Sequence, residues 1–277
     1  MASPPILVTG GTGTLGRLVV PRLLDAGHDV RVLSRRAREP GAGLELVTGD
    51  LATGEGIDAA VEGAEIIVHC AGGPKGDGDK ARHLVGAASR AGVRHLVNIS
   101  VVGADRVPVT SRIDRAMFGY FASKLAAERA VAGSGLPWTT LRATQFHDLL
   151  LLTVRQLAKL PVIPVPAGFR FQPVDPAEVA ARLVDLALGS PAGLVPDLAG
   201  PRVEEMTTLL RTYLRARGKH RPILPVHIPG NAARALRAGA NLSPDHPAGH
   251  CTWEEFLATQ RQPRPSTRPW LADREPP

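Results

Sequence analysis

The chain has few cysteines and few aromatic residues, and it lacks a long hydrophobic run. Cys70 and Cys251 are the two cysteines among 277 residues, so we expect neither a disulfide framework nor a metal site, and a reducing compartment is favoured. The longest apolar run, residues 149–154, is too short to span a bilayer, and no secretory signal is visible at the N-terminus. We therefore expect a cytoplasmic protein with no membrane partner.

The charge balance is basic, with a formal net charge of +7 and a pI near 10.1. Such a balance suits a nucleic-acid partner, but the arginines are spread from Arg17 to Arg274, aromatic residues make up 4%, and no basic helix with interleaved aromatics occurs. We therefore expect no nucleic-acid partner and assign part of the basic excess to an anionic cofactor. Since 44% of the residues are apolar, the chain can bury a sizeable core.

The most informative motif is ILVTGGTGTLG at residues 6–16, in which a short apolar run leads into glycines and then an amphipathic helix. This order of parts holds a dinucleotide: glycines allow a tight turn and a close approach to the pyrophosphate, and the helix N-terminus offers free N–H groups. The residues predicted to bind the cofactor here are Gly10, Thr12, Gly13, Thr14, Leu15 and Gly16.

The first half of the chain alternates short strands with helices, which is typical of a parallel sheet covered on both faces. We predict strands at residues 6–9, 29–34, 44–47, 66–69, 95–99 and 138–141, and helices at 15–26, 57–62, 79–91 and 115–132. The glycines Gly27, Gly92 and Gly135 follow helices, where a left-handed cap is favoured. The predicted fold class is α/β, with a Rossmann-type doubly wound parallel sheet.

After residue 142 the alternation changes. We predict helices at 145–159, 173–188, 204–217 and 232–238 and extended segments at 160–166 and 223–228; Asp175 and Pro176 are expected to start the second of these helices. Residues 1–147 are predicted to form the NADP-binding domain, with 171–200 packing back on it. Residues 148–170 and 201–259 are predicted to form a small C-terminal substrate lobe, and 260–277 a mobile tail.

The end of the second strand indicates the cofactor. An enzyme that uses NAD places a carboxylate there to bind the ribose 2′-hydroxyl, whereas this strand ends Ser34-Arg35-Arg36. Guanidinium groups suit a 2′-phosphate, so NADP is predicted in preference to NAD, with these three residues in the site. The alternative is that both arginines are solvated residues in a turn.

Two further loops follow strands at the same predicted edge of the sheet. Asp50 and Leu51 follow the third strand and are predicted to lie at the adenine, although Asp50 is also suited to capping a turn. Ala71 and Gly72 follow the fourth strand, where small residues let the backbone pass close to the cofactor; a simple glycine turn is the alternative.

A catalytic group is predicted on the helix that follows the fifth strand. Tyr120 and Lys124 are four residues apart and share one helix face; the ammonium is expected to lower the pKa of the phenol and to hold the nicotinamide ribose. Ser100, at the end of the fifth strand, is predicted to polarise the substrate carbonyl, with Thr110 and Ser111 as rivals.

Six segments carry a family resemblance. They are VTGGTGTLG, VLSRR, VNISVVGADR, YFASKLAAE, LPWTTLRATQFHD and FQPVDPAEVAARL. With them the chain resembles the short-chain dehydrogenase/reductase superfamily, in the atypical or extended branch that includes NmrA-like and isoflavone-reductase-like proteins. The resemblance implies NADP in an extended groove and substrate over the nicotinamide, between the sheet edge and the C-terminal lobe.

We therefore expect an NADP-dependent oxidoreductase, a monomer or homodimer, that acts on a small, mostly apolar carbonyl, quinone or enone. Phe118, Phe121, Phe146 and residues 149–152 are apolar and suit the mouth of such a site, with plain core packing as the alternative. Two other functions stay open. One is an NADP(H)-binding redox sensor that acts through a protein partner, and the other is an epimerase or dehydratase that retains its NADP.

Overall fold

The computed structural model describes residues 4–36 and 43–260, and its centre is a seven-stranded parallel sheet with the order β3-β2-β1-β4-β5-β6-β9. The strands are β1 (Ile6–Thr9), β2 (Val30–Ser34), β3 (Leu44–Thr48), β4 (Ile66–His69), β5 (His95–Val101), β6 (Trp138–Ala143) and β9 (Gly193–Leu194). The strand order reverses between β1 and β4, so ligands are expected at the carboxyl edge there. The predicted doubly wound α/β fold is confirmed.

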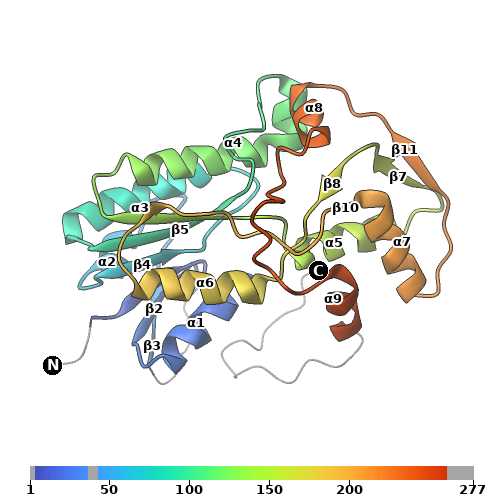
Figure 1. The fold of residues 1–277 in the computed structure, drawn as a ribbon. Coiled ribbons are helices and arrows are strands. Elements are labelled where there is room, and N and C mark those ends of the chain that lie inside the picture. The colour runs from blue at the N-terminus through green and yellow to red at the C-terminus, as the bar shows by residue number, and fades with distance from the viewer. Residues whose placement is uncertain (1–3, 37–42, 261–277) are drawn as a thin grey trace.

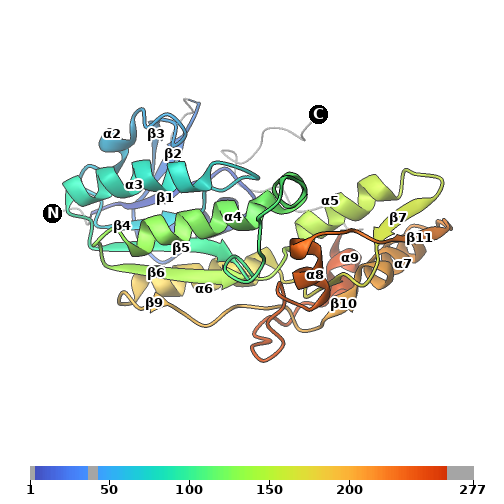
Figure 2. The same cartoon turned by 90° about the horizontal axis from the view of Figure 1, so that it is seen from above.

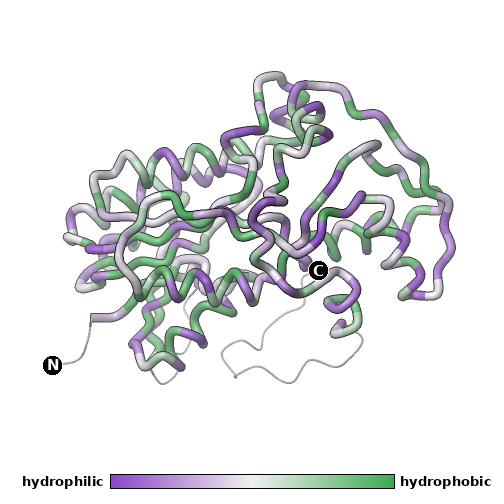
Figure 3. Tube along the Cα trace, in the orientation of Figure 1, coloured by the Kyte–Doolittle hydropathy of each residue, from purple (hydrophilic) through white to green (hydrophobic). Residues whose placement is uncertain are grey.

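Helices cover both faces of the sheet (Figure 1). One face carries α1 (Gly16–Asp25) and α6 (Pro176–Leu188), whose apolar side chains share one core with the strands. The other carries α2 (Ile57–Val61), α3 (Asp77–Ala91) and α4 (Arg112–Ala132) over a second core. Because both faces are buried, the strands are apolar along most of their length, as Figure 3 shows.

Helix α6 lies against the sheet, in contact with α1, β4 and β5. Asp175 accepts a hydrogen bond from the Ala177 N–H at 2.8 Å, and Pro176 occupies the first turn, as predicted. Gly27 and Gly92 end helices with φ of 84° and 68°, in the left-handed region that favours glycine.

The small lobe lies at the end of the molecule opposite the amino ends of the central strands (Figures 1 and 2). It contains α5 (His147–Leu157), β7 (Ile163–Pro166), β8 (Arg170–Phe171), β10 (Glu204–Glu205), α7 (Met206–Ala216), β11 (Ile223–Val226), α8 (Asn231–Arg237) and α9 (Trp253–Thr259). Helices α5, α7 and α9 enclose a core of their own with β7. These three helices thus have a core apart from the sheet, whereas α8 packs on Phe118 of α4; the predicted domain division stays a prediction.

Several boundaries differ from the predicted ones. Helix α4 begins at Arg112 instead of 115 because Ser111 and Asp114 form a capping box, and α3 begins at Asp77 instead of 79. Helix α9 was not predicted; Thr252 and Glu255 form its capping box. The two-residue strands β8, β9 and β10 are too short for a periodic pattern to reveal. Of the predicted mobile tail, residues 261–277 lie outside the described residues. Within the described ranges, no helix is both long and apolar enough to cross a membrane.

His147 is an uncharged histidine in the core of the small lobe. Its side chain is completely buried, and its ring stacks on Phe256 with the ring centroids 4.8 Å apart and packs against Trp253 at 5.9 Å. Neither ring nitrogen has a hydrogen-bond partner among the described residues. Burial lowers the pKa of His147 from 6.5 to about 4, although the Asp175 carboxylate opposes the shift.

This histidine is expected to make the fold acid-sensitive. Between pH 6.5 and pH 4 the unfolded chain binds a proton at His147 and the folded chain does not, so stability falls as the pH falls through that window. At pH 5 the loss is on the order of 2 kcal/mol. Since His147→Phe keeps the stacking and removes the titration, urea unfolding should show a smaller drop between pH 7 and pH 5 for this variant. An unchanged drop would show that His147 is protonated in the folded protein as well.

Candidate functional site

The glycine-rich loop joins β1 to α1 at the carboxyl edge of the sheet. Gly10 has φ 68°, and a Cβ there would lie 2.6 Å from the Ala71 backbone nitrogen; a Cβ at Gly16 would overlap the Gly10 carbonyl oxygen. The Gly13 N–H donates to that same carbonyl at 2.9 Å and closes the turn. No side chain of the described residues caps the N-terminus of α1. The backbone N–H groups of this end are therefore suited to an anion.

The predicted phosphate residues lie together next to this loop. Thr12, Ser34, Arg35 and Arg36 line a cavity of about 420 Å³. Arg35 and Arg36 are exposed. The Ser34 hydroxyl donates to the Arg36 carbonyl oxygen and accepts the Arg36 N–H, and these two hydrogen bonds fix the turn. The Arg17 Nε donates to the Thr12 carbonyl at 2.7 Å. The cavity thus joins the glycine loop to the arginines at the end of β2.

The loops after β3 and β4 have local partners. Asp50 Oδ1 accepts the Ala52 N–H at 2.8 Å, so its carboxylate caps a turn; an adenine contact for Asp50 and Leu51 stays a prediction. Ala71 is packed under Gly10, and Gly72 is exposed. A Cβ at Gly72 would lie 2.6 Å from the Lys124 Nζ. A glycine at this position therefore leaves room for the lysine.

Helix α4 is fixed to the sheet by a buried ion pair. Arg142 on β6 donates from Nε and from the NH2 nitrogen to the two carboxylate oxygens of Glu128, at 2.9 and 2.7 Å, and its NH1 nitrogen lies 2.9 Å from Asp105 Oδ2. This bidentate geometry is the strong form of an arginine–carboxylate contact. It sets the position of the residues one turn earlier on α4, which include Lys124.

Tyr120 and Lys124 share one face of α4, as predicted. The Lys124 Nζ lies 5.8 Å from the centroid of the Tyr120 ring. The lysine side chain is buried, whereas Tyr120 is 36% exposed. The phenol is therefore open to a ligand while the ammonium beside it is shielded from water.

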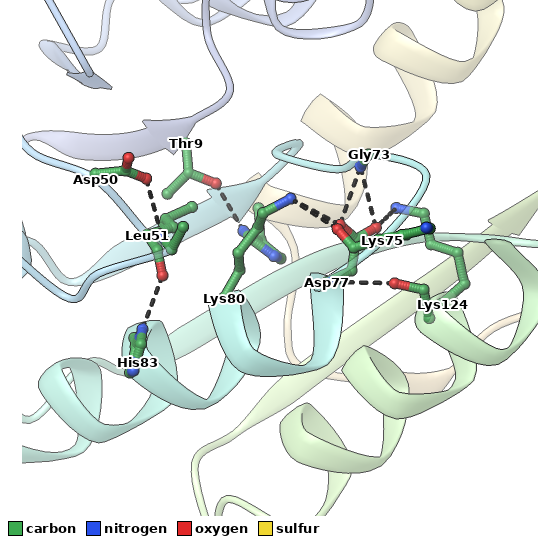
Figure 4. A network of polar contacts seen from close by, with 12 residues as sticks. Thr9, Asp50, Leu51, Gly73, Lys75, Asp77, Lys80, His83 and Lys124 are labelled. Carbon is green, nitrogen blue, oxygen red and sulfur yellow. Dashed lines mark hydrogen bonds and ion pairs between the residues drawn. The ribbon is translucent and has the colours of Figure 1, made fainter. Parts of the chain in front are cut away.

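Asp77, at the start of α3, is the centre of this charge cluster, and sequence reasoning missed it (Figure 4). Its carboxylate lies 3.2 Å from Lys124 Nζ and 3.1 Å from Lys80 Nζ, and both its oxygens accept the Gly73 N–H, at 2.9 and 3.2 Å. The Asp77 N–H donates to Ser123 Oγ on α4 at 3.0 Å. The carboxylate is almost completely buried. Asp77 thus holds Lys124 against the loop that follows β4.

The expectation that Lys124 lowers the pKa of Tyr120 is wrong for this structure. Burial and the negative charge of Asp77 raise the pKa of Tyr120 to about 12. The physical reason is that the lysine charge is paired with the Asp77 carboxylate, so the phenol has a buried anion nearby as well as a cation. Tyr120 is protonated at neutral pH, as any ordinary tyrosine is, and its raised pKa makes it a weaker acid than a free phenol. It is still a stronger acid than the alcohol that a reduced carbonyl becomes, so proton donation stays open to it.

A neutral histidine lies under the same edge. His69, the last residue of β4, has its Nδ1 2.7 Å from the Thr9 hydroxyl oxygen. Burial, reinforced by the Lys124 charge, lowers the pKa of His69 to about 4. The floor of the site therefore adds no positive charge at neutral pH, and Lys124 and Lys80 are the cations beside Asp77.

Of the hydroxyls considered for carbonyl polarisation, Ser100 alone is not used in a helix cap. Ser111 caps α4, and Thr110 Oγ1 lies 3.4 Å from Asp114 Oδ2 in the same cap. Ser100, near the end of β5, is buried, and its Oγ has no hydrogen-bond partner among the described residues. Its catalytic role stays a prediction.

The apolar residues expected at the mouth divide between surface and core. Phe118 is buried against Phe169, which bears out core packing for it. Residues 150 and 151 are likewise buried, whereas Leu149 and Leu152 are each 55% exposed. On α4, Ile113 and Met117 are about half exposed.

The sheet topology, the glycine loop and the edge on which they meet define a dinucleotide-binding protein of the Rossmann class. A family model described as NAD(P)H-binding matches residues 10–185. A reductase of Streptomyces griseus, named (4-alkanoyl-5-oxo-2,5-dihydrofuran-3-yl)methyl phosphate reductase, is 32% identical over 234 residues, which cover 83% of this chain and 79% of that one. The chain therefore belongs to the NAD(P)H-binding family, in the NmrA-like, atypical branch of the short-chain dehydrogenase/reductase superfamily.

Other relatives are matched over a smaller part of their length. A ceramide reductase of Caulobacter vibrioides is 33% identical over 210 residues, covering 69% of this chain and 63% of that one. Among solved structures, an NADPH-dependent quinone oxidoreductase of Escherichia coli in complex with NADPH has a TM-score of 0.76 at 19% identity, covering 93% of this chain and all of that chain. A triphenylmethane reductase of Citrobacter with NADP(H) has a TM-score of 0.72 at 20% identity, over 93% and 100%. The structural likenesses show the shared fold.

Proposed function

We propose that this protein is an NADPH-dependent reductase that delivers hydride to a mostly apolar carbonyl, quinone or enone, with Tyr120 as the proton donor. The observation that carries the proposal is the partly exposed Tyr120 beside a lysine held by Asp77, at the sheet edge that carries the glycine loop. The names of the relatives support it, since two curated relatives are reductases and one solved neighbour is an NADPH-dependent oxidoreductase.

The residues present fit a phosphorylated dinucleotide. The N-terminus of α1 and the loop from Gly10 to Gly16 would hold the pyrophosphate, and Arg35 and Arg36 would bind the 2′-phosphate. Lys124, whose Nζ lies next to Gly72, would hold the nicotinamide ribose. NADPH, when bound, supplies the hydride. The residues of the protein orient the substrate and deliver the proton.

The protein's own chemistry is proton delivery. As hydride arrives at the carbon of a carbonyl, negative charge develops on its oxygen; Tyr120 Oη gives its proton to that oxygen, and solvent then returns a proton to the phenolate. Ser100 is proposed to donate a hydrogen bond to the same oxygen. Lys124, held by Asp77 at 3.2 Å, is proposed to position the nicotinamide ribose and not to make the phenol more acidic.

The surface next to Tyr120 favours an apolar substrate. Ile113, Met117 and Tyr120 are spaced four and three residues apart, so they lie on one face of α4. All three are exposed, at 54%, 51% and 36%. A ligand that reaches the phenol along this face therefore meets aliphatic side chains.

The test is a substrate panel. Purified protein is given NADPH with quinones, enones and aromatic ketones, and NADPH absorbance is followed. Oxidation with one class identifies the substrate class. If NADPH binds but no compound causes its oxidation, the proposed function becomes that of a redox sensor or of an epimerase that retains its NADP. A protein partner whose binding depends on the redox state of the cofactor would then identify the sensor.

Replacing Asp77 should change the pH dependence of this reductase. Burial and the Asp77 charge raise the pKa of Tyr120 to about 12, so Asp77→Asn should lower this pKa and move the fall in rate at high pH to lower pH. The asparagine oxygen can still accept the Gly73 N–H, which preserves the loop. Asp79→Asn is the control, because Asp79 lies in the same first turn but is exposed and pairs with Arg82. Identical pH profiles for the two variants would remove Asp77 from the mechanism.

A further inference from the structure

The positive charge of the chain is concentrated in one segment. Residues 206–244 contain seven Lys or Arg and no Asp or Glu, while the other basic and acidic residues, 26 of each, cancel. The whole net charge of +7 therefore equals the charge of this segment, which forms α7, β11 and α8 of the small lobe. Arginines occur along the entire chain, but here they are not balanced.

Part of this charge lines a groove at the far end of the small lobe. Arg211, Arg215, Lys219 and Arg221 border a cavity of about 690 Å³, together with Thr208, Leu214, His220 and Pro222. All four cationic residues are exposed. Within the described part of the chain, no carboxylate lies at ion-pair distance from any of them. Among the described residues, the cations of this groove thus have no counterion.

An exposed apolar edge adjoins the groove. Strand β11 follows Pro222 directly, and its Leu224 and Val226 are 55% and 39% exposed. Leu224 is opposite Pro164 of β7, and Val162, just before β7, is 47% exposed. In Figure 3 both strands are hydrophobic in colour, and the turn between α7 and β11 is hydrophilic. Aliphatic side chains and unpaired cations therefore share one end of the molecule.

The composition of this end disfavours other occupants. The prolines at 164 and 225 lack the N–H groups that an added strand needs. Tyr213, the one aromatic residue of 206–244, is buried, so no platform for stacked bases is present there. A second copy placed face to face would bring like charges together. Cations beside aliphatic side chains match an anionic lipid headgroup layer over an acyl boundary.

We propose that this end of the small lobe, with Arg211, Arg215, Lys219 and Arg221 beside Val162 and Leu224, docks peripherally on an anionic membrane surface. The cations contact the headgroups, and the two aliphatic side chains enter the interface without crossing it. This departs from the expectation of no membrane partner, which rested on the lack of a spanning segment. The proposal is independent of the proposed reductase activity.

The test is cosedimentation of the full chain with vesicles. One set contains phosphatidylglycerol in phosphatidylcholine, and the other contains phosphatidylcholine alone. We expect sedimentation with the anionic vesicles that declines as salt is raised. Lys219→Glu with Arg221→Glu should weaken it at least about tenfold, and Leu224→Ser by a smaller factor. The control Arg90→Glu with Arg94→Glu makes the same charge change on exposed residues of the sheet domain and should leave binding within about twofold.

Three results would overturn the proposal. The first is that the wild type stays in the supernatant with anionic vesicles. The second is that the control pair weakens binding as much as the 219/221 pair, which would show that only the net charge of the protein matters. The third is that Leu224→Ser has no effect while an acidic polypeptide competes fully, which would show that the groove is a docking site for acidic proteins. Undiminished NADPH binding by each variant shows that it is folded. Since the readout is sedimentation, its outcome is separate from that of any turnover assay.

Discussion

Tyr120→Phe is expected to lower the rate of NADPH oxidation by at least about 100-fold, the usual effect of losing a general acid. The phenyl ring keeps its place on α4, so only the hydroxyl group is lost. NADPH affinity should stay within about twofold, because the phosphate-binding residues belong to the glycine loop and to the end of β2. The measurement is steady-state kinetics with the substrate class found in the panel, together with cofactor titration.

The chain supplies a matched control for this variant. Its second tyrosine, Tyr213, is buried in the core of the small lobe. Tyr213→Phe removes the same hydroxyl away from the sheet edge and should leave the rate near that of the wild type. If Tyr120→Phe is as active as Tyr213→Phe, Tyr120 is not the proton donor.

Arg35→Asp combined with Arg36→Ala is expected to weaken NADPH binding much more than NADH binding. Each hydrogen bond to a charged group is worth about 1.5–3 kcal/mol, so NADPH should bind roughly 10- to 100-fold more weakly, and the new carboxylate repels the 2′-phosphate besides. NADH has no such phosphate, and its affinity should hold or improve through the ribose 2′-hydroxyl. Parallel titrations of the two cofactors measure the ratio.

A suitable control is Arg94→Ala, which removes an exposed arginine at the amino end of β5. It should leave both affinities unchanged. If the Arg35 and Arg36 double variant weakens NADPH and NADH equally, the cavity at the end of β2 is not the 2′-phosphate site, and the two arginines are solvated turn residues.

Much of the fold was predictable because its signals are local. The six strands that carry the glycine loop and the predicted site are short apolar runs bounded by turn residues. The start of α6 is marked in the sequence by Asp175 as the cap and Pro176 in the first turn. The pairing of Tyr120 with Lys124 follows from helical spacing alone. Each of these depends on residues that are near one another in the sequence.

The parts that escaped prediction depend on distant contacts. Asp77 and Lys124 are 47 positions apart, and in the sequence Asp77 stands in a GDGDK run that reads as an ordinary helix start. Only the packing of α3 on α4 brings its carboxylate to the lysine, and burial together with this carboxylate raises the pKa of Tyr120. The pKa of Tyr120 is therefore a tertiary property, although its pairing with Lys124 on one helix face could be predicted from spacing.

Single-turnover oxidation of bound NADPH, compared between the wild type and Tyr120→Phe with the same acceptor, tests the central claim most directly. It isolates the chemical step from product release. The proposed function predicts rapid oxidation by the wild type and at least about 100-fold slower oxidation by the variant. Equal rates in the two proteins would contradict it.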